Sequence, residues 1–135
     1  MSTELDTLLE QWTDNDSKTK LAFTELLEHL NTLEGVELDF DARPGVTYSL
    51  RPRHTGQKNR KLFGMVDVID DDPEDRWLSV CFYKEFITDP DEAGDSVPEG
   101  LMGEDAHCFD LYEFDADEVA YLKARLTEAA GNAPE

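Results

Sequence analysis

Positive charge is scarce in this sequence. Twelve lysines and arginines stand against 32 aspartates and glutamates, which gives a formal net charge of -20. Nucleic-acid backbones and anionic membranes are bound through basic faces, so we expect neither as a direct partner. The acidity itself is explained most simply by solubility, because at physiological salt the Debye length of about 8 Å screens most of the repulsion.

Long hydrophobic runs and cysteines are also few. No stretch approaches the ~20 apolar residues of a membrane span, and the N-terminal residues lack the basic and apolar pattern of a secretory leader. The two cysteines, Cys81 and Cys108, each lie in an apolar and aromatic run. We therefore expect buried free thiols and a cytoplasmic location. The alternative is a disulfide between them, which requires that their two strands are neighbours in the sheet.

Motifs for catalysis and metal binding are missing. The chain has no Gly-x-Ser-x-Gly, no Gly-Lys-Ser/Thr and no Gly-x-Gly-x-x-Gly. Residues 89–95 begin like a calcium loop, but Ala93 and Gly100 stand where oxygen ligands are needed. The pair 107–108, even with Cys81, lacks the short paired spacing of a zinc site. We predict no cofactor and no metal.

Apolar stripes at helical spacing predict helices at both ends of the chain. One stripe lies within residues 3–12 and is followed by a polar break at 13–17. A second stripe runs to Gly35, which is placed to end that helix. A third begins after Asp115, a helix-capping residue, and the tail 131–135 is expected to fray.

Between the helices the hydrophobic period changes to two, which is typical of strands. The predicted strands cover residues 36–40, 46–51, 62–69, 77–86 and 107–114. Segment 88–106 is acidic and contains proline and glycine, so we expect a long loop. This order predicts an α+β two-layer sandwich: N-terminal helices, a mainly antiparallel sheet of about five strands and a C-terminal helix. The length fits a single domain, 1–135, with residues 1–16 as a short helix and linker.

One face of the predicted sheet carries aromatic side chains. Trp77 and Tyr83 alternate with the core candidates Leu78, Val80 and Phe82. If they are uncovered they form an apolar patch of the kind that marks a partner surface. The alternative is that the N-terminal helix or the long loop covers them.

A basic cluster is the most distinctive feature of the chain. The candidate binding residues are Arg51, Arg53, His54, Lys58, Arg60 and Lys61. The fourth strand returns to the same end of the sheet, so we expect the acidic residues Asp89, Asp91, Glu92 and Asp95 beside this loop. Two interpretations stay open besides scattered solvated charge: an ionic latch within the chain, or an anion site built on arginine forks.

Three segments carry a resemblance to known proteins: ARPGVTYSLR at 42–51, LFGMVDVIDDDPEDRWLSVCFY at 62–83 and GLMGEDAHCFDLY at 100–112. Over about residues 36–126 the chain resembles a small bacterial α+β family, and the resemblance implies no activity, cofactor or catalytic residue. The helix–sheet–helix plan is also similar to frataxin-like proteins. Their acidic ridge lies on the first helix, whereas the longest acidic runs here are in predicted loops, so we expect no iron site.

These observations favour a non-enzymatic binding or protein-interaction module. Its basic loop 51–61, beside the acidic segment 88–106, would take a protein partner or a small anion. One alternative is a small metal-dependent hydrolase-like enzyme that uses Asp89, Asp91, Asp95 and His107. Another is an acidic mimic of nucleic acid, with carboxylates in rows about 6–7 Å apart, the spacing of side chains on one strand face. The sequence indicates no oligomeric state.

Overall fold

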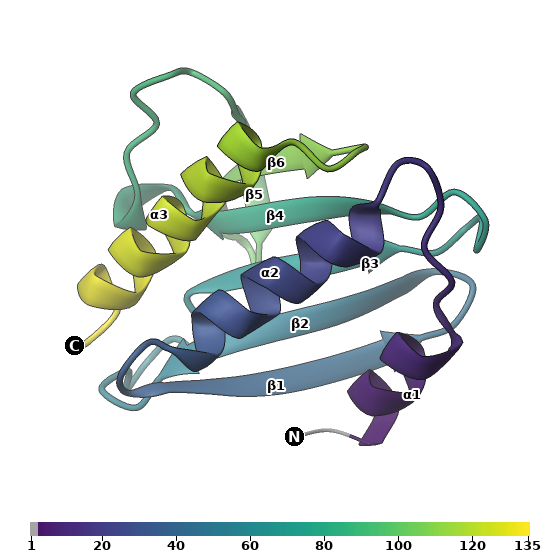
Figure 1. The fold of residues 1–135 in the computed structure, drawn as a ribbon. Helices are drawn as coiled ribbons and strands as arrows, with labels where there is room; N and C mark the ends of the chain where they lie inside the picture. The colour runs from purple at the N-terminus through teal and green to yellow at the C-terminus, as the bar shows by residue number, and fades with distance from the viewer. Residues whose placement is uncertain (1–2) are drawn as a thin grey trace.

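Three α-helices pack on one face of a six-stranded antiparallel sheet in the computed structural model (Figure 1). The structure describes residues 3–135; Met1 and Ser2, which the predicted domain 1–135 includes, lie outside the described residues. The α+β prediction, with helices before the sheet and one after it, is confirmed. The sheet has six strands rather than five. Within residues 3–135 no helix is both long and apolar enough to cross a bilayer.

The order of elements along the chain is helix, helix, six strands and helix. They are α1 (Thr3–Gln11), α2 (Thr19–Asn31), β1 (Val36–Arg43), β2 (Thr47–His54), β3 (Gly64–Ile69), β4 (Trp77–Tyr83), the 3-10 turn η1 (Lys84–Phe86), β5 (Asp95–Leu101), β6 (Glu104–Leu111) and α3 (Ala116–Asn132). The strand order in the sheet is β1-β2-β3-β4-β6-β5. The hairpin β5–β6 therefore joins the sheet through β6, and β1 and β5 are its edges.

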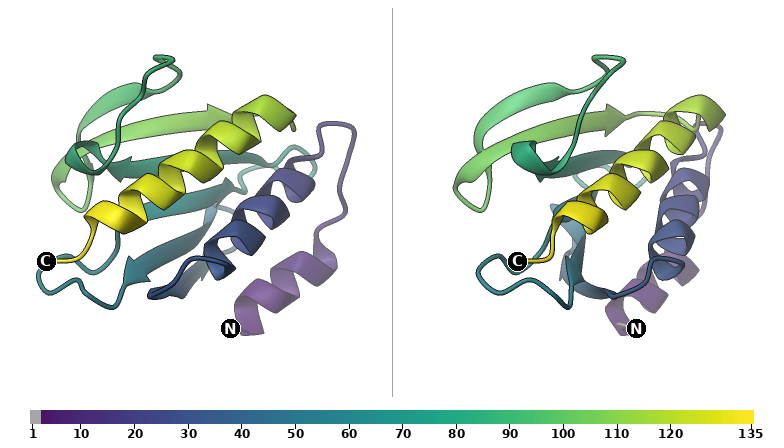
Figure 2. Two further views of the ribbon diagram at one scale, coloured as in Figure 1. Left: turned by 60° about the vertical axis from the view of Figure 1, so that its left-hand side comes forward. Right: turned by 90° about the vertical axis from the view of Figure 1, so that its left-hand side faces the viewer.

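The core lies between the helices and one face of the sheet. Alternate residues of β3 and β4, such as Val66 and Val80, are fully buried and meet the apolar stripe of α2, which includes Phe23 and Leu26. The helices α2 and α3 lie side by side across this face, and the opposite face carries no helix (Figure 2). The apolar side chains that repeat every 3.6 residues in the helices therefore pack against those that repeat every two residues in the strands, in one contiguous core.

The ends of the helices follow local chemistry. Asp115 caps α3 as predicted, because its side chain accepts hydrogen bonds from the backbone N–H groups of Asp117 and Glu118. Gly35 does not cap α2, which ends at Asn31. It lies in the turn before β1 with φ +76°, where a Cβ would come within 2.7 Å of the His54 ring. Both the backbone conformation and this close approach require glycine.

The tail after α3 packs against the molecule. We expected residues 131–135 to fray, but Ala133 is fully buried and the Glu135 N–H donates to the Gly56 carbonyl at 3.0 Å. The Glu135 carboxylate also accepts a hydrogen bond from the backbone N–H of Asn59 at 3.1 Å. The tail thus supports the loop between β2 and β3.

Part of the expected loop 88–106 is a strand. β5 pairs with β6 through a tight turn in which Met102 and Gly103 both have positive φ, 51° and 81°. This conformation is the usual one for a two-residue hairpin, although Met is a rare choice for it. Every residue of β5 except Leu101 is exposed, so no apolar alternation revealed the strand.

The two cysteines are joined in a disulfide. Cys81 on β4 lies directly opposite Cys108 on β6, with the Cα atoms 4.1 Å apart. The expectation of free thiols is wrong, and the alternative of neighbouring strands is the correct one. The predicted cytoplasmic location rested on free thiols and loses that support.

The predicted aromatic patch is half correct. Trp77 lies on the helix-free face, partly exposed, and its ring stacks on Tyr112 with centroids 4.9 Å apart. Tyr83 is buried instead, because the chain turns into η1 directly after it and brings Phe86 to 5.4 Å from its ring.

Candidate functional site

The loop between β2 and β3 forms an open cleft at one end of the sheet, with a volume of about 330 Å³. We call it the basic cleft; its lining residues are Asp39, Arg53, His54, Gln57, Lys58, Arg60 and Lys61. All the predicted binding residues except Arg51 line it. Local hydrogen bonds hold the loop: the Gln57 side chain accepts from the His54 N–H at 2.9 Å and donates to the Leu62 carbonyl at 2.7 Å.

Arg60 ties this loop to two other segments. Its guanidinium pairs with Glu104 at 2.6 Å and with Glu85, and it lies 4.3 Å from the centre of the Tyr83 ring. Hydrogen bonds to Glu104 and then Glu85 raise the pKa of Arg60 further, despite the opposing effect of burial. The same contact with Arg60 lowers the pKa of Glu104. We call this set of contacts the Arg60 latch; it joins the basic loop to η1 and to the start of β6.

The remaining arginines of the cluster are paired along the helix-free face of β1. Arg53 contacts Glu37 at 2.8 Å and Asp39 at 3.3 Å, and Arg51 contacts Asp41 at 3.5 Å. These three carboxylates alternate along one strand face, so each arginine reaches across from β2.

Lys58 and Lys61 differ from the arginines. Both are exposed, and neither makes an ion pair with any residue between 3 and 135. With His54, which takes a hydrogen bond from the Gly56 N–H on its Nδ1, they provide the donors of the cleft that carboxylates leave unoccupied.

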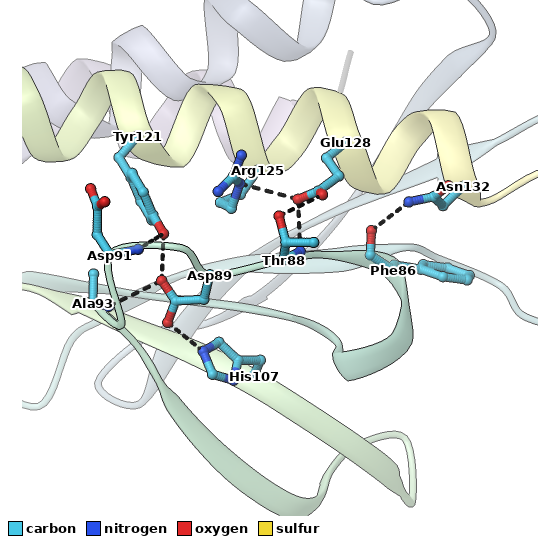
Figure 3. Close-up of polar contacts among 10 residues, drawn as sticks. All are labelled: Phe86, Thr88, Asp89, Asp91, Ala93, His107, Tyr121, Arg125, Glu128 and Asn132. Atoms are coloured by element: carbon cyan, nitrogen blue, oxygen red, sulfur yellow. Dashed lines mark hydrogen bonds and ion pairs between the residues drawn. The ribbon is translucent and has the colours of Figure 1, made fainter.

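The acidic residues expected beside the basic loop lie elsewhere. Asp89 contacts His107 and Tyr121, and Asp91 donates its backbone N–H to Tyr121 (Figure 3). Asp95 pairs with Cys108 in the β5–β6 hairpin. The prediction was wrong because residues 89–91 turn onto α3 and β6 instead of contacting the loop, and β5 returns to the loop only at its far end. Only Glu104, at the end of the segment, reaches Arg60.

Asp89 is the centre of a densely hydrogen-bonded polar group, which we call the Asp89 clasp (Figure 3). Its carboxylate accepts from His107 Nε2 at 2.7 Å, from the Tyr121 hydroxyl, and from the N–H groups of Ala93 and Gly94 at 3.0 and 2.9 Å. Burial alone would raise the pKa of Asp89, but these four hydrogen bonds outweigh it and hold the pKa well below its usual range.

The clasp fastens the segment after β4 to α3. Thr88 donates from its N–H and its hydroxyl to Glu128, at 2.9 and 2.8 Å, and Asn132 donates to the Phe86 carbonyl at 2.8 Å. Because four donors occupy the Asp89 carboxylate, it is arranged to hold a loop rather than to bind a ligand. The likeness of residues 89–95 to the start of a calcium loop has a structural reason: the Asp89 carboxylate closes its own turn by accepting from the N–H groups of Ala93 and Gly94.

No metal-binding group emerges between residues 3 and 135, where no three His, Cys, Asp or Glu side chains are arranged to hold an ion. The disulfide also occupies both sulfurs that a zinc site with His107 would have used.

A smaller cavity of about 180 Å³ lies between α3, the end of β6 and the segment before β5. Its floor is apolar, with Phe109 and Leu122, and its rim carries Asp91, Asp117 and Glu118. Burial, followed by the nearby charges of Asp115 and Glu113, raises the pKa of Glu118.

Comparison with known proteins gives no match for this chain, neither among protein-family models nor among curated proteins nor among solved structures. The resemblance of residues 36–126 to a small bacterial family therefore stays a prediction.

The Arg60 latch can be tested by substitution. Arg60→Gln is expected to lower the free energy of unfolding by about 1–2 kcal/mol, since it removes two partly exposed ion pairs and the stacking on Tyr83. Arg60→Lys keeps the positive charge but loses the forked geometry of the guanidinium, so its free energy of unfolding should lie between those of Arg60→Gln and the wild type. Urea denaturation measures both, and equal stability of all three proteins would contradict the latch.

Proposed function

We propose that this protein is a non-enzymatic binding module whose basic cleft takes an anionic group, a carboxylate or a phosphate. The observation that carries the proposal is that Lys58 and Lys61 are exposed in one cleft and have no ion-pair partner among residues 3–135, although the protein has 32 acidic residues. Lys18 and Lys84 also make no ion pair within residues 3–135, but Lys58 and Lys61 share one cleft. Here every arginine of the same cluster has acquired a carboxylate partner.

Contacts from other segments of the chain hold the loop that forms the basic cleft. The Arg60 latch and the Glu135 carboxylate hold residues 59–60 in place, and Gln57 closes the loop internally. Such preorganisation lowers the entropy cost of binding. The acidic remainder of the surface repels anions only within about one Debye length, about 8 Å at physiological salt. We therefore expect affinity that is modest and that changes with salt concentration.

Pyrophosphate and citrate are suitable probes, one for each chemistry of the anion. In a titration followed by calorimetry, Lys58→Gln with Lys61→Gln should weaken binding about tenfold, as expected for two partly screened contacts. The matched control is Lys18→Gln with Lys20→Gln, which makes the same change in net charge at the start of α2. Absence of binding to the wild type, or equal weakening by the control, refutes the proposal.

The two other functions considered from the sequence have less support. A hydrolase would need Asp89 free, but hydrogen bonds occupy its carboxylate. A nucleic-acid mimic would need rows of unpaired carboxylates. β1 carries a row of carboxylates, but Arg51 and Arg53 form ion pairs with them. A cytoplasmic location and a protein partner stay predictions of the sequence.

A further inference from the structure

The helix-free face of the sheet carries an apolar row at the end opposite the basic cleft. Ile69 on β3 lies directly opposite Trp77 on β4, and Trp77 stacks on Tyr112, which follows β6. Ile69 and Trp77 are partly exposed, and Tyr112 is 61% exposed. We call these three residues the aromatic row. Since α1, α2 and α3 all lie on the other face, the described part of the chain leaves the row uncovered (Figure 2).

Carboxylates surround this row. The turn between β3 and β4 joins Ile69 to Trp77, and Asp110 and Glu113 flank Tyr112. The exposed acidic residues of the turn are Asp71, Asp72, Glu74 and Asp75, and none of them has an ion-pair partner among residues 3–135.

Cations are few at this end of the sheet. Arg76 is buried and engaged with Asp70, and Arg43 lies on β1, where it donates to Thr47. Lys18 and Lys20 flank Thr19, whose hydroxyl donates to the Arg76 carbonyl. Acidic residues outnumber cations around Trp77 and Tyr112, and those of the turn lack ion pairs among residues 3–135, whereas the carboxylates of β1 have arginine partners.

We propose that the aromatic row and its acidic rim form a docking surface for an arginine-rich peptide segment of a partner protein. A guanidinium group stacks on an aromatic face and forks onto a carboxylate, and this surface offers both, because the acidic turn joins Ile69 to Trp77. Neighbouring strands lie about 4.8 Å apart, so a row across β3, β4 and β6 matches an extended segment of a few residues.

Charge complementarity selects this occupant over the others. A second copy of the chain carries the same net charge of -20 and would be repelled. Nucleic acid and anionic lipid would meet the same repulsion. A basic segment is attracted, and the stacked rings give it apolar contact as well as charge.

A peptide of alternating arginine and glycine is the probe, titrated by calorimetry into the full chain. Trp77→Ala with Tyr112→Ala should weaken binding by at least about tenfold, because the stacking surface is lost. The matched control is Leu21→Ala, which removes an exposed apolar side chain, 41% exposed, from the helix layer. The control should bind like the wild type.

A second set of variants tests the rim without touching packed side chains. The triple variant Asp71→Asn, Glu74→Gln, Asp75→Asn should weaken binding several-fold, and the triple variant Glu10→Gln, Glu28→Gln, Glu92→Gln should not. Both change the net charge equally, so equal weakening shows general attraction to a polyanion and overturns the proposal.

A lysine–glycine peptide of the same length completes the test. It should bind more weakly than the arginine peptide, because ammonium groups neither fork nor stack as guanidinium groups do. Equal affinity for the two peptides, or no binding of the arginine peptide to the wild type, also overturns the proposal. The lysines of the basic cleft take no part in any of these variants, so the two binding proposals succeed or fail separately.

Discussion

Replacing Arg76 by alanine is expected to lower the free energy of unfolding by about 3–5 kcal/mol, the usual cost of leaving a buried charge without its partner. Arg76 Nε donates to Asp70 at 2.7 Å, and the two side chains are only 8% and 3% exposed. The guanidinium also lies 5.4 Å from the ring centre of Trp12. Its removal would leave the Asp70 carboxylate buried without its charged partner, with the Gly45 N–H and the Tyr48 hydroxyl as hydrogen-bond donors.

Denaturation in urea measures this loss, with Arg43→Ala as the control. Arg43 is exposed and donates a single side-chain hydrogen bond, so its removal should cost about 0.5 kcal/mol or less. The double variant Arg76→Met with Asp70→Asn should recover part of the stability, because it removes the uncompensated charge. A loss below about 1 kcal/mol for Arg76→Ala would show that the pair contributes little.

Asp89→Ala is expected to cost about 3 kcal/mol. The substitution deprives the Tyr121 hydroxyl, His107 and two backbone N–H groups of their acceptor, and hydrogen bonds to a charged group contribute about 1.5–3 kcal/mol each before solvent replaces some of them. Tyr121→Phe removes one of these donors and keeps the ring, so it should cost about 1 kcal/mol.

The Asp89 carboxylate also accounts for part of the loss of folding stability that we expect at low pH. The folded-state pKa of Asp89 lies well below the unfolded value of about 3.9, so its contribution to stability is complete above that pH. It is lost as the pH falls toward the folded-state pKa, when the carboxylate takes up a proton. Asp89→Asn should therefore unfold with a flatter dependence on pH below about pH 4 than the wild type. Identical slopes would mean that the clasp does not hold an ionised carboxylate.

The helices and the inner strands could be predicted because their side chains alternate between core and solvent. In β3 and β4 every second residue is buried, and the same pattern is visible in the letters of the sequence. β5 could not be found in this way, since six of its seven residues are exposed. The pairing of Cys81 with Cys108 depends on which strand lies beside β4, and that information is not local.

The candidate site was predictable in part for a similar reason. The clustering of Arg53, Lys58 and Lys61 is a property of one loop, and the structure keeps them around one cleft. The partners of that loop were not predictable, because Glu85, Glu104 and Glu135 reach it from three distant segments. The partners of Asp89 were also not predictable, because its turn closes onto α3 and β6 rather than onto the basic loop.

The two borders of the sheet discourage the addition of another strand. β1 presents alternating carboxylates, and β5 contains Pro98, which has no N–H to donate, within an irregular stretch between Val97 and Leu101. A second chain would meet negative charge at the β1 edge and an interrupted row of hydrogen-bonding groups at the β5 edge. The protein is therefore guarded against edge-to-edge aggregation, and any partner that it recognises must be held by side chains rather than by backbone pairing.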